Sequence, residues 1–140
     1  MGKLTYLLDS NILSEPLKPA PNPGVMAGLQ RHRHACSTAA VVWHELHYGC
    51  DRLPAGAKKQ TIADYLRQLA ATHLPILPYD ENAAVWHAGE RARLTAQGQT
   101  PSFANGQIAA IAKTNGLVVI TRNTGGFSGF EGLRVENWFR

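Results

Sequence analysis

Short apolar runs with the character of β-strands recur along the chain, and stretches with helical spacing separate most of them. The runs span residues 4–8, 35–43, 74–79, 116–123 and 133–138. The run at 35–43 passes from a strand into the helical pattern that follows it. The run at 116–123 is continuously apolar before it ends in a polar turn, a pattern typical of strands in a parallel sheet that is covered on both faces.

Segments with helical periodicity or helix-capping residues lie between these runs. They span residues 10–18, 21–32, 41–53, 54–73, 80–98 and 101–112. The first is predicted to be brief, because Pro16 and Pro19 stop it, whereas Asp80 and Gly98 have the residue types that open and close a helix. This alternation predicts a single α/β domain over residues 1–140, with a mainly parallel sheet flanked by helices.

Four oxygen-bearing side chains are predicted to gather at the edge of this sheet where parallel strands end and α/β proteins bind ligands. Asp9 and Asn123 follow strands, and Glu45 and Asn105 lie near the starts of helices that can open on the same crevice. Convergent carboxylates repel each other unless a cation lies between them, and Mg²⁺ and Mn²⁺ prefer oxygen ligands. Such a site can hold and polarise a phosphodiester. Each residue also has a simpler structural explanation: Asp9 can start a turn, Glu45 can be a solvated helix carboxylate, and Asn123 can belong to the turn NTGG.

The composition is that of an ordinary globular domain. With 140 residues, 44% of them apolar and 17% charged, the chain can bury a core without disulfides. No apolar run approaches the roughly 20 residues that a membrane span needs, so we expect a cytoplasmic protein that makes no membrane contact. Cys36 and Cys50 lack CxxC spacing and are predicted to be reduced, half-buried thiols. The net charge of +4 weakly favours a polyanionic partner.

Three further patterns have simple structural interpretations. HELHY differs from the zinc-protease motif HExxH because Tyr48 replaces the second histidine, so His44 and His47 are expected to be surface residues that could touch each other. The loop NTGGFSG lacks the Lys and the Ser or Thr of a phosphate-binding P-loop and is expected to form a flexible rim. Packing in the core or an interface is a simpler role than base stacking for Trp43, Trp86 and Trp138.

Four segments occur in a recognisable order: YLLDSNILSE, VVWHELHYG, PSFANGQIAAIA and GLVVITRNTGGF. They resemble, in the same order, the opening strand with the first acid, the segment with the second acid, the helix that presents the third, and the strand and loop of the fourth position in the PIN-domain ribonucleases. The resemblance is to the VapC-like toxins of bacterial type II toxin–antitoxin pairs in particular. It covers nearly the whole chain, including RLPAG and VENWF, and implies a PIN-like three-layer α/β domain.

The resemblance implies roles for individual residues. Residues with an implied catalytic role are Asp9, Glu45, Asn105 and Asn123, and the first three would bind a Mg²⁺ or Mn²⁺ ion. Residues that could support the first acid, by hydrogen bonds around it, are Ser10, Asn11 and Thr121. The family tolerates Asn at position 123, and Gly126 stands where the family often has an acid.

Asn105 is a serious departure, because the family has Asp at this position. Ser102 is the predicted N-cap of this helix, which places Asn105 at the third helical position, where a polar side chain can reach back to the cap. A helix N-terminus favours an anion, and the neighbouring Gly106, which costs about 1 kcal/mol relative to Ala in a helix, would permit the close approach of another backbone or a ligand. We therefore expect the fold to survive while metal affinity and turnover fall. An engineered exchange of Asp for Asn, favoured by the intact remainder of the pattern, and a natural degenerate copy both fit this sequence.

The resemblance implies a metal-dependent endoribonuclease toxin that cleaves structured RNA, such as a ribosomal RNA loop or a tRNA, including the anticodon loop of initiator tRNA. It also implies a homodimer and a cognate VapB-like antitoxin that covers the acidic crevice. Residues that could contact RNA phosphates are Arg31, Arg33, Arg91, Arg93 and Arg122. The alternative is a catalytically dead PIN-like module that binds RNA or protein. A DNA-directed nuclease of the flap-endonuclease kind is disfavoured because the chain lacks the length for a helical arch.

Overall fold

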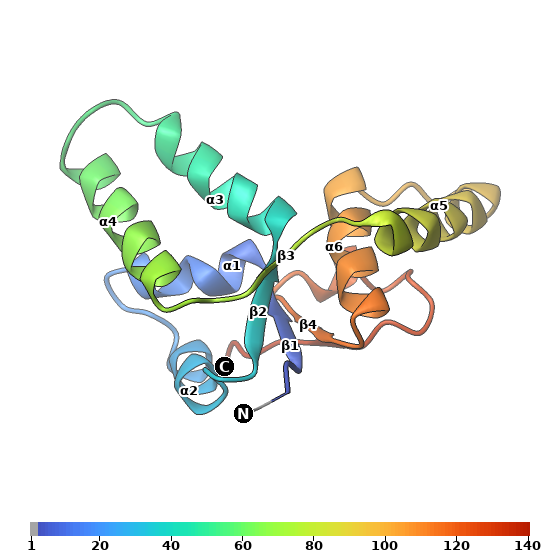
Figure 1. The fold of residues 1–140 in the computed structure, drawn as a ribbon, viewed down its shortest axis with the longest axis horizontal. Coiled ribbons are helices and arrows are strands. Elements are labelled where there is room, and N and C mark those ends of the chain that lie inside the picture. The colour runs from blue at the N-terminus through green and yellow to red at the C-terminus, as the bar shows by residue number, and fades with distance from the viewer. Residues whose placement is uncertain (1–2) are drawn as a thin grey trace.

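A sheet of five parallel strands forms the centre of the protein (Figure 1). The computed structural model describes residues 3–140, so the first two residues of the predicted domain lie outside the described part. The strands are β1 (Tyr6–Leu8), β2 (Cys36–Ala39), β3 (Ile76–Leu77), β4 (Val118–Ile120) and β5 (Val135–Glu136). Their order in the sheet is β3-β2-β1-β4-β5, and every neighbouring pair is parallel. The predicted strands are therefore confirmed, although each is shorter than its apolar run.

Helices cover both faces of this sheet. They are α1 (Ser10–Leu13), α2 (Pro23–Arg31), α3 (Ala40–Asp51), α4 (Ala57–Ala71), α5 (Glu81–Ala96) and α6 (Phe103–Thr114), with short 3-10 helices η1 (Glu15–Leu17) and η2 (Thr124–Gly126). The first four α-helices lie on one side of the sheet, and α5 and α6 lie on the other (Figure 1). This three-layer arrangement confirms the predicted α/β fold.

Proline and serine residues determine the local structure of two segments, residues 10–18 and the start of α6. The segment predicted as one helix over residues 10–18 is two elements, because α1 ends at Leu13 and η1 follows it. Pro16 lies at the beginning of η1, where its missing N–H is tolerated, so it does not stop the segment. Ser102 caps α6 as predicted, since its hydroxyl accepts a hydrogen bond from the backbone N–H of Asn105 at 3.0 Å. The cap fixes the first turn of α6, and with it the position of Asn105.

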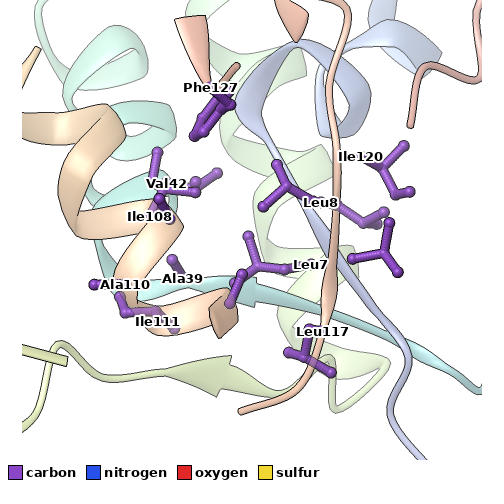
Figure 2. Close-up of a cluster of buried hydrophobic side chains, with 14 of the residues drawn as sticks. Leu7, Leu8, Ala39, Val42, Ile108, Ala110, Ile111, Leu117, Ile120 and Phe127 are labelled. Atoms are coloured by element: carbon purple, nitrogen blue, oxygen red, sulfur yellow. The ribbon is translucent and has the colours of Figure 1, made fainter. Parts of the chain in front are cut away.

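The core fills the space between the sheet and the helices. Leu7 and Leu8 of β1 lie in one cluster with Val42 of α3 and Ile108 of α6 (Figure 2). Beyond Ile108, α6 is lined with small residues that are fully buried, namely Ala109, Ala110 and Ala112. Because small side chains allow a close approach, α6 packs firmly and its N-terminus is held beside the ends of the strands.

Cys36 and Cys50 are free thiols, as predicted, but both are buried rather than half-buried. Burial raises the pKa of Cys36 to about 11, so this thiol stays protonated at neutral pH. In the part of the chain from Lys3 to Arg140, none of the helices is long and apolar enough to cross a lipid bilayer.

Candidate active site

The order of the strands reverses at β1, which leads through α1 and α2 to β2 on one side and has β4 on its other side. Open parallel sheets bind ligands at such a reversal, outside the carboxyl ends of the strands. Asp9 directly follows β1, and residues 121–123 directly follow β4. The structure therefore brings the first and the fourth of the predicted catalytic positions to the reversal point.

Asp9 is the buried carboxylate at this edge, with 7% of its surface exposed. Its Oδ1 accepts a hydrogen bond from the backbone N–H of Ser10 at 2.8 Å, and its Oδ2 accepts one from the hydroxyl of Thr121 at 2.9 Å. Burial raises the pKa of Asp9 above its ordinary value, and these two hydrogen bonds partly oppose the rise. Asp9 is thus held in one orientation with its charge incompletely compensated, which favours a cation nearby.

The hydroxyl of Thr121 ties the two strand ends together. It is fully buried, donates to Asp9, and accepts hydrogen bonds from Nδ2 of Asn11 at 3.2 Å and from the backbone N–H of Asn123 at 3.0 Å. Asn11 in turn accepts a hydrogen bond through Oδ1 from the backbone N–H of Arg122 at 3.0 Å. Asn11 and Thr121, both predicted to support the first acid, therefore surround it.

Glu45 is the second carboxylate of the site. It lies half-buried in the middle of α3 and not near the start of its helix, where the sequence pattern had placed it. Burial raises the pKa of Glu45, and the negative charge of Asp9 raises it further, whereas hydrogen bonding by the Ser10 side chain and the charge of His44 lower it. Since Asp9 acts on the pKa of Glu45, the fold brings the two acids into electrostatic contact.

Gly126 lies between the side chains of Asn105 and Asn123. A Cβ atom added to Gly126 would lie 2.8 Å from Nδ2 of Asn105 and 2.6 Å from Nδ2 of Asn123. Nδ2 of Asn105 also donates to the carbonyl oxygen of Gly126 at 3.4 Å, a hydrogen bond that an ionised Asp could not donate. Asn123 is joined to Asp9 through Thr121, so these contacts connect Asp9, Asn105 and Asn123. They also explain why this chain has glycine at position 126.

Gly106, next to Asn105, packs against His87 of α5. A Cβ atom at Gly106 would lie 2.2 Å from Nε2 of His87, so a larger residue would displace the imidazole. Nδ1 of His87 lies 2.8 Å from the hydroxyl of Tyr79, and burial lowers the pKa of His87, with a further contribution from the charge of Arg91. The group that approaches Gly106 closely is therefore a neutral side chain, and not the backbone or ligand that was predicted from the sequence. Sequence reasoning did not find His87, and the glycine inside a helix was its only signal.

The donor atoms of the site suit a hard divalent cation, but only two of the side chains carry a charge. Throughout the described residues, no group of three or more His, Cys, Asp or Glu side chains could hold a metal ion. Asp9 and Glu45 are acids with raised pKa values, which a divalent cation would lower, and the amide oxygens of Asn105 and Asn123 are neutral ligands of the same hard class. These residues fit Mg²⁺ or Mn²⁺, with a weaker attraction than three carboxylates would give.

The histidines of HELHY contact other aromatic rings and not each other. The ring of His47 lies 4.7 Å from that of Trp43 between centroids, and the ring of His44 lies 6.3 Å from that of Tyr48. A contact between the two histidines was one possibility, and the structure instead pairs each of them with an aromatic residue four positions away on the helix.

The loop after β4 is anchored in the core. It forms η2, and the following Phe127 is fully buried while most of the loop is exposed, so its expected flexibility stays a prediction. Trp86 and Trp138 also pack against the core, as predicted. The loop that holds Gly126 and Asn123 thus forms one wall of the site.

The arginines predicted to contact RNA are dispersed over the molecule. The exposed ones are Arg31, Arg33, Arg91 and Arg122. Arg93 is half-buried and forms two hydrogen bonds of 2.9 Å with Glu90 and one of 2.8 Å with the carbonyl oxygen of Gly129. Arg122 lies between Thr121 and Asn123 in the chain, but its guanidinium lies over the ring of Phe139, 4.6 Å from the ring centroid, so its charge is directed toward the C-terminal segment.

The sequence profile of the PIN domain matches residues 6–132. The chain belongs to the PIN-domain family. It is 39% identical over 127 residues to the toxin FitB of Neisseria gonorrhoeae, in a match that covers 86% of this chain and 89% of FitB. It is 29% identical over 136 residues to the tRNA(fMet)-specific endonuclease VapC of Shigella flexneri, covering 96% of this chain and 98% of VapC. In the structure of FitAB bound to an IR36 DNA fragment, a chain with 33% identity superposes with a TM-score of 0.88 over 97% of this chain and 96% of that one.

These similarities confirm the family inferred from the four motifs. The PIN-domain match begins at Tyr6, the first residue of β1, and extends through η2. It therefore includes the segments that carry Asp9, Glu45, Asn105 and Asn123.

Proposed function

We propose that this PIN domain is the toxin of a toxin–antitoxin pair and that its active form is a metal-dependent endoribonuclease. The electrostatic contact between Asp9 and Glu45 at the reversal point carries the proposal, because two acids with raised pKa values in one place need a compensating cation. The relatives support it, since one is a toxin and the other a tRNA(fMet)-specific endonuclease.

Each polar residue of the site has a role in this reaction. Asp9, Glu45, Asn105 and Asn123 would hold the ion, and bound Mg²⁺ or Mn²⁺ would polarise the phosphodiester and lower the pKa of a water molecule. Thr121 and Asn11 keep Asp9 in one orientation. Arg122, which is exposed and stacks on Phe139, is a candidate for binding an RNA phosphate that flanks the site.

The variant Asn105→Asp tests this function, because it supplies a third carboxylate to the site. We expect Mn²⁺ to bind about tenfold more tightly, which a larger thermal stabilisation by Mn²⁺ would show, and RNA to be cleaved about tenfold faster. A tenfold change in either quantity corresponds to about 1.4 kcal/mol. Asn105→Ala, which removes the amide without adding charge, should produce neither gain. If Asn105→Asp cleaves no RNA with Mn²⁺ or Mg²⁺ and does not arrest cells that lack the antitoxin, this function is wrong for the chain.

The substrate we propose is structured RNA, with tRNA the first candidate because the VapC relative is specific for tRNA(fMet). Parallel digests of tRNA, ribosomal RNA fragments and DNA by Asn105→Asp test the choice, and a preference for DNA would contradict it. We also propose that the chain forms a homodimer and binds a VapB-like antitoxin over Asp9 and Glu45. Light scattering of the chain alone should give twice its 15.2 kDa mass.

Asn105 itself favours a second candidate function, a catalytically dead module that binds RNA or protein. Its amide donates a hydrogen bond to Gly126, so the neutral residue is integrated into the site. The two functions predict different behaviour for the Asn105→Asp variant. A dead module would bind RNA and gain no cleavage, whereas a toxin would gain both metal binding and cleavage.

A further inference from the structure

A cavity of about 380 Å³ borders the candidate active site at Asn105. The end of α5, the N-terminal turn of α6 and the loop after β4 enclose it, and Asn105 is part of its lining. Its volume lies at the lower end of the range for small-molecule sites, which is about 300–1,000 Å³. The cavity is therefore suited to one small group, such as a single nucleoside, and not to a duplex.

The lining of this cavity is uncharged and offers both hydrogen-bonding and apolar surface. Gln99, Thr100 and Ser128 contribute polar side chains, and the buried Leu94 and Phe130 contribute apolar ones. A nucleoside likewise combines a flat apolar face with donors and acceptors at its edge. Since no acidic side chain lines the cavity, it does not repel the RNA backbone as Asp9 and Glu45 do.

Gln99 is placed to read the edge of a base. Its backbone N–H donates to the carbonyl oxygen of Leu94 at 2.8 Å, which fixes the chain at this point. Within residues 3–140 its side-chain amide makes no hydrogen bond, so both the donor and the acceptor are available. A Cβ atom added to Gly129 would lie 3.3 Å from Oε1 of Gln99, so the glycine leaves room for this amide.

We propose that this cavity binds the nucleoside next to the scissile phosphate and that Gln99 determines which base is accepted. The inference rests on the endoribonuclease function proposed above. Asn105 joins the cavity to the acids, because it lines the cavity and contacts the loop that carries Asn123. A phosphate positioned by the cation that Asp9 and Glu45 would hold thus brings its attached nucleoside to the cavity, in a single-stranded segment whose base is free to enter.

Gly125 provides a clean way to close the cavity. It lines the cavity, and a Cβ atom added there would meet no atom within 4 Å, so a larger residue at the rim of the cavity does not disturb the packing. In the Asn105→Asp background, we expect Gly125→Val to lower the rate of cleavage of a single-stranded RNA loop about tenfold, the factor that 1.4 kcal/mol gives. Stabilisation by Mn²⁺ should stay unchanged, because Gly125 contacts none of the metal ligands. Gly89→Val in α5, where an added Cβ atom also meets nothing within 4 Å, is the matched control and should leave the rate unchanged.

Gln99→Ala tests base recognition in the same background. We expect it to cleave a panel of RNA loops, each with a different base beside the cut, with less discrimination than the parent. Unchanged rates in Gly125→Val together with unchanged base preference in Gln99→Ala would overturn the subsite while leaving the endoribonuclease function intact. Absence of cleavage by the Asn105→Asp parent would instead overturn the function, and the subsite with it.

Discussion

The carboxylates of Asp9 and Glu45 destabilise the folded protein when both are ionised and no cation is bound. Burial raises both pKa values, and the charge of Asp9 raises that of Glu45 further. A carboxyl group whose pKa is raised on folding binds its proton more tightly in the folded state. Its contribution to stability is therefore fully present below the pKa of the unfolded chain, about 4, and is lost as the pH rises through the folded pKa.

Glu45→Gln should consequently stabilise the protein at neutral pH in the presence of EDTA. We expect the melting temperature at pH 7 to rise by about 2–4 °C, as roughly 1 kcal/mol would give, and the difference to disappear near pH 4, where the parent carboxyl is also neutral. Thermal unfolding at the two pH values measures this effect. Glu81→Gln on the exposed surface of α5 is the control and should show no such rise. Equal melting temperatures for Glu45→Gln and the parent at pH 7 would show that the two acids do not repel.

Thr121→Val should loosen Asp9 and cost stability at the same time. The hydroxyl that it removes makes three hydrogen bonds in a fully buried position, and leaving buried partners unpaired costs about 1–3 kcal/mol. Thr121→Ser keeps the hydroxyl and should retain Mn²⁺ binding. Urea unfolding and Mn²⁺ titration distinguish the roles, and identical metal affinity in the two variants would mean that the hydroxyl does not orient Asp9.

The spacing between α5 and α6 depends on one glycine. Alanine normally stabilises a helix by about 1 kcal/mol relative to glycine, but a Cβ atom at Gly106 would collide with Nε2 of His87. We therefore expect Gly106→Ala to lower the free energy of unfolding by about 1–3 kcal/mol, the usual cost of overpacking. Gly89→Ala, in open space on α5, should instead be neutral or stabilising.

Urea unfolding of these variants, and of Gly106→Ala combined with His87→Ala, measures the coupling. The combined variant should lose less stability than the two single changes added together, because removal of the ring makes room for the methyl group. Strict additivity would mean that α6 shifts to accommodate the alanine without contacting His87.

The elements that could be predicted from the sequence are those whose signals are local. The apolar runs marked the strands, and Ser102 marked the start of α6, because a strand side chain or a cap acts on its own neighbourhood. The contact of Gly106 with His87 and the burial of Phe127 depend on elements distant in sequence, so no local pattern indicates the partner. Glu45 was predicted only in part. The family motif indicated its role, but its place in the middle of the helix depends on where α3 begins.

At the scale of the whole molecule, the topology explains why the site is where it is. The reversal of strand order places the ends of β1 and β4 side by side, and Thr121 joins them through Asp9. The sheet therefore fixes the acids, whereas the positive charge is spread over exposed arginines on several elements. A long RNA would then be bound by dispersed phosphate contacts and cut at one fixed point.

The salt dependence of RNA binding tests this division of roles. Each phosphate contact in a single strand contributes about 0.7 to the slope of log affinity against log salt concentration, because binding releases counterions. Arg122 is exposed and stacks on Phe139 with no ion pair among residues 3–140, so Arg122→Gln should reduce the slope by about that amount. Arg93 is already paired with Glu90 through two hydrogen bonds, so its charge is less available to RNA, and Arg93→Gln should change the slope less.

Fluorescence anisotropy with a labelled RNA loop, between about 50 and 200 mM salt, measures both slopes. If the two variants changed the slope equally, the charge of Arg93 would be as available to RNA phosphates as that of Arg122, and the pairing with Glu90 would not reduce it.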